Sequence, residues 1–194
     1  MASLVLTGDT SGQVTLAAAA VAGSNTITVQ AATGTMSVNT LATAVASTSG
    51  TSIDFTALPS WIKRITVMLS GVSTNSTSSK LVQLGTGSTV FTTTGYVSTG
   101  TILTNGAAIS SVGQTVGFHL YSNAAADEIS GQFVITNVTG NLWVASYSAS
   151  MNTTSTGVGG GRVSLGSTLT AVRITTVNGT DTFDAGTINI LYEG

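Results

Sequence analysis

The clearest pattern in this chain is the run Ile129-Ser-Gly-Gln-Phe-Val-Ile-Thr-Asn137, followed after a short turn by Asn141-Leu-Trp-Val-Ala-Ser-Tyr-Ser-Ala-Ser-Met151. In the second run Trp143, Ala145 and Tyr147 occupy alternate positions. Because successive side chains of a β-strand point to opposite faces, this spacing places the three on one face of a strand. Such a face is more typical of a β-sandwich core or a subunit interface than of a ligand-binding surface.

Similar alternation continues through residues 53–194, with Asn, Ser, Thr and Gly turns between the runs. Pro59 is expected to bend the chain before a strand rather than to interrupt one. We therefore predict an all-β fold, an antiparallel β-sandwich of the jelly-roll type. The predicted strands span residues 62–69, 80–84, 115–121, 129–137, 141–151, 158–165, 170–176 and 186–193.

Residues 1–46 differ from the rest of the chain. Three short strand-like units begin there at the evenly spaced Gly12, Gly23 and Gly34. These units carry few large apolar side chains, so burial within one copy cannot offset the entropy lost when the segment becomes ordered. Other copies are the simplest partner, which predicts an extended β segment in an intertwined homotrimer. A flexible Ala/Thr-rich tail is the alternative, and residues 47–194 are expected to form the separate jelly-roll domain.

Charged residues are scarce: Lys and Arg number 5, and Asp and Glu number 7, in 194 residues. Catalytic sites depend on ionisable groups with shifted pKa values, so we expect neither enzymatic activity nor a cofactor. A net charge of −2 without clustered Lys and Arg provides no means of neutralising phosphates. We therefore expect no nucleic-acid partner.

Membrane insertion is not expected either, although the mean hydropathy is +0.42. The longest apolar stretch, residues 16–23, is far shorter than the ~18–20 residues that a spanning helix needs. Residues 1–6 have no basic region and no long apolar core, so no secretory signal is expected. The lack of cysteine agrees with synthesis in a cytoplasm.

Several stretches at both ends and in the middle of the chain form a recognisable pattern. Near the N-terminus they are Leu6-Thr-Gly-Asp-Thr-Ser-Gly-Gln-Val-Thr-Leu16, Ala22-Gly-Ser-Asn-Thr-Ile-Thr-Val29 and Ala31-Ala-Thr-Gly-Thr35. Further along they are Ser52-Ile-Asp-Phe55, Leu58-Pro-Ser-Trp-Ile-Lys-Arg-Ile-Thr-Val67, Ser70-Gly-Val-Ser-Thr-Asn75 and Phe183-Asp-Ala-Gly-Thr-Ile-Asn-Ile-Leu-Tyr-Glu193. The first group resembles the N-terminal segment, and the second group the compact β-domain, of tailed-bacteriophage virion proteins that are mostly fibre-type or unassigned. Members of that family tend to carry prolines near residues 17–20 and before Ala31, where this chain has Ala and Gln.

The resemblance implies a non-enzymatic, homotrimeric component of a phage virion, made in the host cytoplasm and attached to other virion proteins through its N-terminal segment. Two placements stay open: a short fibre-like appendage of the tail, and a capsid decoration protein that stabilises the shell. The appendage is slightly favoured. A carbohydrate- or receptor-binding module that contacts a host cell-surface glycan is a further alternative.

Aromatic residues offer the one candidate ligand surface. Trp143, Tyr147 and Tyr96, together with Trp61 and Tyr121, could present flat faces to a sugar beside Asn and Thr side chains. A place in the sandwich core or a subunit interface is the competing interpretation of the same residues.

Ionisable residues predict no metal site. His119 is the only histidine and cysteine is absent, so we expect His119 on the solvent- or subunit-facing side of a strand. Asp127 and Glu128 are adjacent, so they would point to opposite faces of a strand or be solvated in a loop. Asp181 and Asp184 lie near a turn but lack the array of oxygen ligands that Ca²⁺ needs.

Two further features are interpreted as structural. Gly157-Val-Gly-Gly-Gly-Arg162 lacks the Lys-Ser/Thr of a phosphate loop, so it predicts a bulged strand or one against which a neighbouring backbone packs closely. The scarce charges are expected to form inter-strand or inter-subunit pairs. These are Lys63, Arg64, Arg162 and Arg173 on one side and Asp54, Asp181 and Asp184 on the other.

Overall fold

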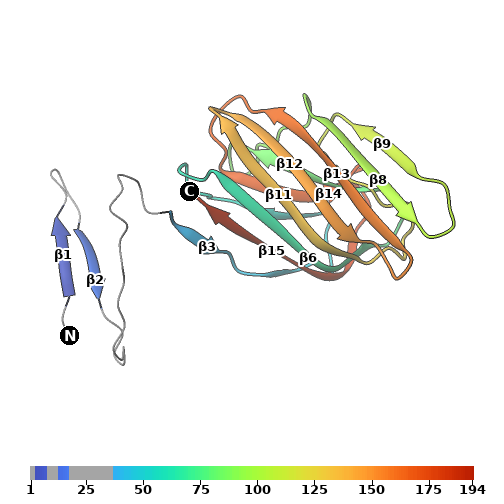
Figure 1. Ribbon diagram of the computed structural model, residues 1–194, viewed down its shortest axis with the longest axis horizontal. Coiled ribbons are helices and arrows are strands. Elements are labelled where there is room, and N and C mark those ends of the chain that lie inside the picture. Colours follow the sequence, from blue (N-terminus) through green and yellow to red (C-terminus); the bar gives the residue numbers. More distant parts are fainter. Residues whose placement is uncertain (1–2, 8–12, 18–36) are drawn as a thin grey trace. The chain divides into compact units, whose positions relative to one another are not determined.

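The computed structural model describes residues 3–7, 13–17 and 37–194 (Figure 1). The chain divides into two compact units, Met1–Met36 and Ser37–Gly194, and each is described by itself. In the first unit, β1 (Ser3–Thr7) pairs antiparallel with β2 (Gln13–Ala17). Strand β2 matches the unit predicted after Gly12, whereas the unit predicted at Gly23 lies outside the described residues, as does most of the one at Gly34.

The second unit consists of strands and turns, with no helix among its described residues, and all its strand pairs are antiparallel. A nine-stranded sheet has the order β3-β15-β6-β11-β12-β13-β8-β9, with β4 also paired to β15, and a four-stranded sheet has the order β10-β7-β14-β5. No described helix is long and apolar enough to cross a membrane.

The nine strands of the larger sheet are β3 (Asn39–Leu41), β4 (Val45–Ala46), β6 (Arg64–Thr74), β8 (Val97–Thr104), β9 (Ser110–Gln114), β11 (Ile129–Thr139), β12 (Leu142–Ser150), β13 (Ser155–Ser164) and β15 (Phe183–Glu193). The four strands of the smaller sheet are β5 (Ser52–Phe55), β7 (Lys80–Gly85), β10 (Phe118–Leu120) and β14 (Ala171–Thr176).

The all-β, antiparallel part of the prediction is confirmed, and each predicted strand overlaps an observed one. The prediction missed β5, and it missed β8 and β9, which form the hairpin at one edge of the larger sheet. Their sequences, VSTGTILT and SSVGQ, contain few large apolar residues and little alternation. They join the sheet because β8 pairs with β13 and β9 pairs with β8.

The predicted domain boundary after residue 46 differs from the structure. Strands β3 and β4 both pair with β15, with Leu41 opposite Leu191 and Ala46 opposite Thr187. The compact β-domain therefore begins at Ser37. Two short strands of three and two residues carry too little pattern to be assigned to a sheet from sequence.

One apolar core lies between the two sheets, a sandwich-like arrangement (Figure 1). Phe133 of β11 and Tyr147 of β12 stack with ring centroids 5.3 Å apart. The ring centroid of Phe118 of β10 lies 5.9 Å from that of Phe133. These contacts join the larger sheet to the smaller one. Val82 and Leu84 of β7 face the same core.

The glycine-rich stretch lies in β13 and makes room for the core. At Gly159, a Cβ atom would lie 2.5 Å from the Tyr147 ring and would collide with the backbone oxygen of Thr99. The pairing of β13 with β12 and β8 runs without a register shift. Of the two predicted alternatives, close packing against a neighbouring strand is therefore correct and a bulge is not.

Irregular pairing bends the strands β6 and β15. Their register shifts twice, between Phe183 and Ala185 and between Ala185 and Thr187. Gly186 and Gly71, which lie at this irregularity, have φ angles of 96° and 61°, a region that favours glycine. A Cβ atom on Gly186 would collide with the backbone oxygen of Gly71.

Candidate functional site

The predicted aromatic ligand surface is part of the core. Tyr96, Trp143 and Tyr147 are 1%, 3% and 6% exposed. The Tyr96 hydroxyl accepts the N–H of Leu84 at 2.8 Å, and burial raises the pKa values of both tyrosines. The surface assignment of these three side chains is therefore corrected: the alternation of Trp143 and Tyr147 marks the inward face of β12, and Tyr96 is buried in the same core.

Trp61 and Tyr121, the other two aromatic candidates, are less buried, and the N–H of Tyr121 donates to the Tyr147 hydroxyl at 3.2 Å. Trp61 is 39% exposed and packs beside Tyr192, with ring centroids 5.9 Å apart. Tyr121 is half-buried, and its hydroxyl lies 3.0 Å from Ser110 Oγ. The five aromatic residues do not form one surface.

His119 is buried rather than solvent-facing, which corrects its predicted position. It is 1% exposed because the β8–β9 hairpin covers it, and its Nδ1 lies 2.9 Å from the carbonyl oxygen of Val112. Its Nε2 has no hydrogen-bond partner among the described residues. Burial lowers the pKa of His119 below its ordinary value of 6.5, and the Val112 carbonyl opposes that shift. His119 is therefore held as a neutral ring at physiological pH.

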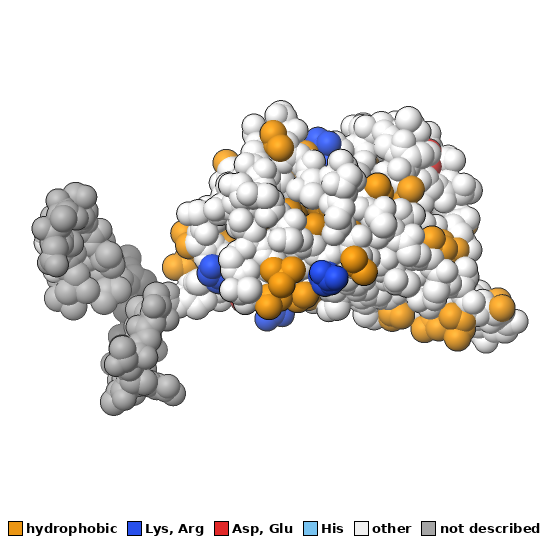
Figure 2. Space-filling model, turned by 90° about the horizontal axis from the view of Figure 1, so that it is seen from above, with side chains coloured by type: hydrophobic (Ala, Val, Ile, Leu, Met, Phe, Trp, Pro, Cys, Tyr) orange, Lys and Arg blue, Asp and Glu red, His pale blue; other side chains and the backbone are white. Residues whose placement is uncertain are grey.

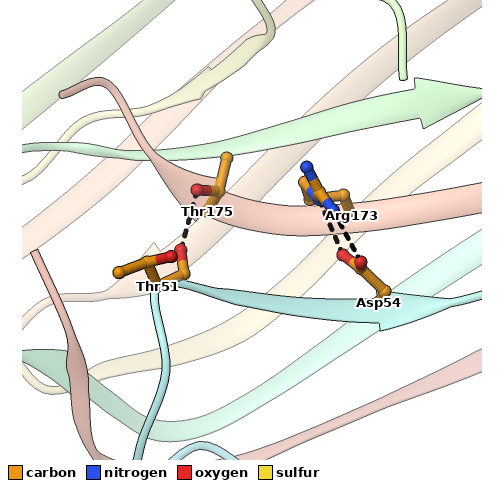
Figure 3. A network of polar contacts seen from close by, with 4 residues as sticks. All are labelled: Thr51, Asp54, Arg173 and Thr175. Atoms are coloured by element: carbon orange, nitrogen blue, oxygen red, sulfur yellow. Dashed lines mark hydrogen bonds and ion pairs between the residues drawn. The ribbon is translucent and has the colours of Figure 1, made fainter. Parts of the chain in front are cut away.

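The predicted charge pairing is confirmed at one inter-strand pair (Figure 3). Arg173 of β14 donates from Nε and Nη2 to both carboxylate oxygens of Asp54 on β5, at 2.8 and 2.7 Å. The guanidinium also lies 4.0 Å from the ring centroid of Phe91. Arg64 pairs instead with Glu193, at 3.5 Å. These pairs join neighbouring strands of one chain.

A buried lysine, which the sequence analysis did not single out, lies at one end of the sandwich. Lys80 is completely buried, and its Nζ donates to Ser122 Oγ at 3.2 Å. Burial lowers the pKa of Lys80 below its ordinary 10.5, while Asp127, Asp184 and Asp181 oppose that shift. No carboxylate among the described residues forms an ion pair with it.

Asp127 is held in place by three donors. The N–H groups of Asn123 and Ala124 both donate to its Oδ2 at 3.1 Å, and Asn152 Nδ2 donates to its Oδ1 at 3.0 Å. Asp127 is 3% exposed, which corrects the prediction of a solvated carboxylate. A carboxylate offers about four lone-pair positions, so one acceptor position on Oδ1 stays free.

A pocket of 390 Å³ opens beside Asp127, and we call it the end pocket. Three loops form it: the β8–β9 turn, the segment between β10 and β11, and the β12–β13 turn. Its lining is mostly hydroxyls, amides and small apolar side chains, with Asp127 as its charged group. The lining residues are Ile102, Thr104, Ala107, Ala108, Ser110, Asn123, Ala124, Asp127, Asn152, Thr154 and Ser155.

Asp181 and Asp184 each accept hydrogen bonds from neighbouring neutral groups. Asp181 accepts from Asn178 Nδ2 at 2.6 Å and from the N–H of Ser78 at 3.0 Å, while Asp184 accepts from the Ser73 hydroxyl. Within the described ranges, no group of three or more His, Cys, Asp or Glu residues could hold a metal ion. Both carboxylates are occupied by neutral donors.

The outward face of the larger sheet is broad and poor in charge, and we call it the outer face. On its central strands β11, β12 and β13, the outward side chains are Ser130, Gln132, Val134, Thr136, Leu142, Val144, Ser146, Ser148, Ser150, Thr156, Val158, Arg162 and Ser164. Arg162 is the only ionisable residue in this set. In the view of Figure 2 the β-domain is mostly neither apolar nor charged, with scattered apolar patches.

Comparison with known proteins returned no matching family model, no matching curated protein and no matching solved structure.

Proposed function

We propose that this chain is a non-enzymatic structural protein of a bacteriophage virion. In this proposal it is a homotrimer that forms a short fibre-like appendage, with the β-domain as a jelly-roll head and the segment of residues 1–46 as the attachment to other virion proteins. Residues 37–46 of that segment pair with β15, so the attachment proper would be carried by the residues before Ser37.

The observation that carries this proposal is the outer face. Burying charged groups at a subunit interface costs free energy unless they are paired, and this face carries one ionisable residue on its three central strands. Val144 is 39% exposed there, and Val97 and Leu103 of the neighbouring β8 are 58% and 40% exposed. Exposed apolar side chains with few charged neighbours suit burial against another copy.

Solution mass tests the trimer. We expect the purified chain to have three times the subunit mass of 19.3 kDa. Ser146→Arg places a charge at the centre of the outer face and should shift the assembly towards monomer. Ser167→Arg, in an exposed turn outside that face, is the matched control and should stay trimeric. A monomeric wild-type chain at micromolar concentration contradicts the proposal.

Labelled electron microscopy of particles tests the placement. A signal at the tail supports the appendage, and a signal distributed over the capsid supports the alternative, a decoration protein that stabilises the shell. A chain lacking residues 1–36 should keep its β-domain, as judged by circular dichroism, and lose incorporation into particles. Normal incorporation of the shortened chain would exclude the attachment role.

The end pocket favours a second candidate function, a carbohydrate- or receptor-binding module. Its volume of 390 Å³ falls within the range of small-ligand sites, and its carboxylate, amides and hydroxyls suit a neutral polyol such as a glycan unit. NMR titration with a panel of neutral monosaccharides tests this function. We expect shifts at Asn123 and Thr154 that disappear in Asn123→Ala but persist in Asn141→Ala, which lies outside the pocket. Shifts that persist in both variants would exclude the pocket as the binding site.

A further inference from the structure

The chain contains two Asn-Gly dipeptides, Asn105-Gly106 and Asn178-Gly179, and the fold holds them differently. In this dipeptide the glycine has no side chain to shield its backbone nitrogen, which can attack the asparagine carboxamide. Both glycines lie in turns with positive φ, 72° at Gly106 and 68° at Gly179. The same reactive pair is therefore present twice, and the surroundings differ.

Asn105 lies in the exposed turn between β8 and β9. The turn is closed by the N–H of Ala107, which donates to the Thr104 carbonyl at 3.1 Å, and the N–H of Asn105 donates to the Thr154 carbonyl at 3.0 Å. Within the described part of the chain, neither the carboxamide of Asn105 nor the N–H of Gly106 has a hydrogen-bond partner. Both reacting groups are therefore free to move towards each other.

The carboxamide of Asn178 is held by hydrogen bonds from both its oxygen and its nitrogen. Its Oδ1 accepts from the Thr176 hydroxyl at 2.9 Å and from the N–H groups of Thr180 and Asp181 at 3.1 and 3.2 Å. Its Nδ2 donates to Asp181 Oδ1 at 2.6 Å. The N–H of Gly179, which would be the nucleophile, donates to the Thr176 carbonyl at 3.1 Å. Reaction here requires several of these bonds to break first.

We propose that Asn105 is a site of spontaneous deamidation and that the fold protects Asn178 from the same reaction. The backbone nitrogen of Gly106 loses its proton and forms a bond to Asn105 Cγ. The Cγ–Nδ2 bond then breaks, and the amino group leaves as ammonia with the transferred proton. Water opens the resulting succinimide at either carbonyl, so that one water is consumed, one ammonia is released, and aspartate or isoaspartate is formed.

This modification places a negative charge on the turn that carries Ala107 and Ala108, which line the end pocket together with Asp127. Every conversion also makes a chain of net charge −2 more acidic by one unit. The inference does not depend on the proposed virion function, because it concerns the purified chain alone.

Peptide mapping by mass spectrometry tests it. The purified full-length chain is incubated at physiological temperature and mildly alkaline pH, and the acid and isoaspartyl forms of the two peptides are quantified over time. A reaction that must first break one or two hydrogen bonds is slowed by about tenfold or more. We therefore expect Asn105 to convert at least about tenfold faster than Asn178.

The same incubation in concentrated urea is the control. There both dipeptides are unfolded, and we expect their rates to converge because the local sequences are alike. Gly106→Ala should suppress conversion at Asn105 while Asn178 is unchanged, and Thr176→Val should accelerate Asn178 by removing one bond to its Oδ1. Equal rates in the folded chain, or faster conversion at Asn178, would overturn the proposal.

Discussion

The two faces of strand β12 share one backbone and opposite environments. Trp143 and Tyr147 point inward and are 3% and 6% exposed, whereas Val144 and Ser146 point outward and are exposed. The hydrogen-bonded pairing is common to both faces, so the difference comes from side chains alone. We therefore expect the inward face to carry most of the stability of the domain and the outward face to tolerate substitution.

Truncation on the inward face should have the largest effect. Phe133→Ala on the neighbouring β11 removes a fully buried ring that stacks on Tyr147, so we expect a loss of about 3–5 kcal/mol in the free energy of unfolding. Thr136→Ala, on the outward side of the same strand, should stay within about 0.5 kcal/mol of the wild type. Equilibrium urea denaturation measures both, and similar losses would remove the distinction between the faces.

Lys80 breaks the rule that the inward side is apolar, because its side chain is fully buried beside Ser122. Lys80→Met keeps the volume and removes the ammonium group, so we expect stability at neutral pH to rise by about 1 kcal/mol or more. In the folded protein the pKa of Lys80 lies below 10.5, so at pH values just below 10.5 the folded wild type binds fewer protons than the unfolded chain does. Wild-type stability should therefore recover as pH rises through this window, and the advantage of the variant should shrink. If Lys80→Met is more stable than the wild type by the same amount at every pH, the gain comes from packing and not from removal of the ammonium group.

His119 makes a smaller, pH-dependent contribution under the β8–β9 hairpin. Its folded pKa is lowered below 6.5, so the unfolded state binds more protons in the window below 6.5. Stability should consequently fall as pH decreases through 6.5. His119→Asn offers a donor to the Val112 carbonyl but does not titrate. Denaturation curves at several pH values should therefore show a weaker dependence of the free energy of unfolding on pH below 6.5. An unchanged slope would assign the acid sensitivity to other groups.

The ion pair between Arg173 and Asp54 should have the smallest effect. Its side chains are 31% and 28% exposed, so solvent screens the attraction, and we expect a coupling energy of about 0.2–1 kcal/mol. A double-mutant cycle with Arg173→Met and Asp54→Asn isolates this coupling. Added salt should reduce it further, and a coupling that salt does not change would indicate a contact that water does not reach.

The parts of the fold that could be predicted from sequence are those with strong alternation, such as β11 and β12. The hairpin of β8 and β9 was missed because its serines, threonines and glycines fit a strand and a loop equally well. Strands β3 and β4 were assigned to the N-terminal segment because their partner, β15, lies at the opposite end of the chain. Pairing across that distance leaves no local signal.

Candidate sites were less predictable than strands. The alternation of Trp143 and Tyr147 was correctly placed on one face, yet the sequence did not distinguish a core from a ligand surface. Asp127 appeared to be an ordinary loop carboxylate, and its donors come from Asn123, Ala124 and Asn152. The turn that contains Asn152 approaches only through the pairing of β12 with β13. A lysine at the start of the apolar run Lys80-Leu-Val-Gln-Leu84 was the signal that could have pointed to the buried amine.

The contact between Gly186 and Gly71 bears on how the sequence can vary over evolution. Gly186 is half-buried in a strand, where exposure alone would suggest wide tolerance. Any side chain there meets the backbone of Gly71, which cannot move aside as a flexible side chain would. In a saturation mutagenesis library selected for folded protein, Gly186 should therefore be among the least variable positions.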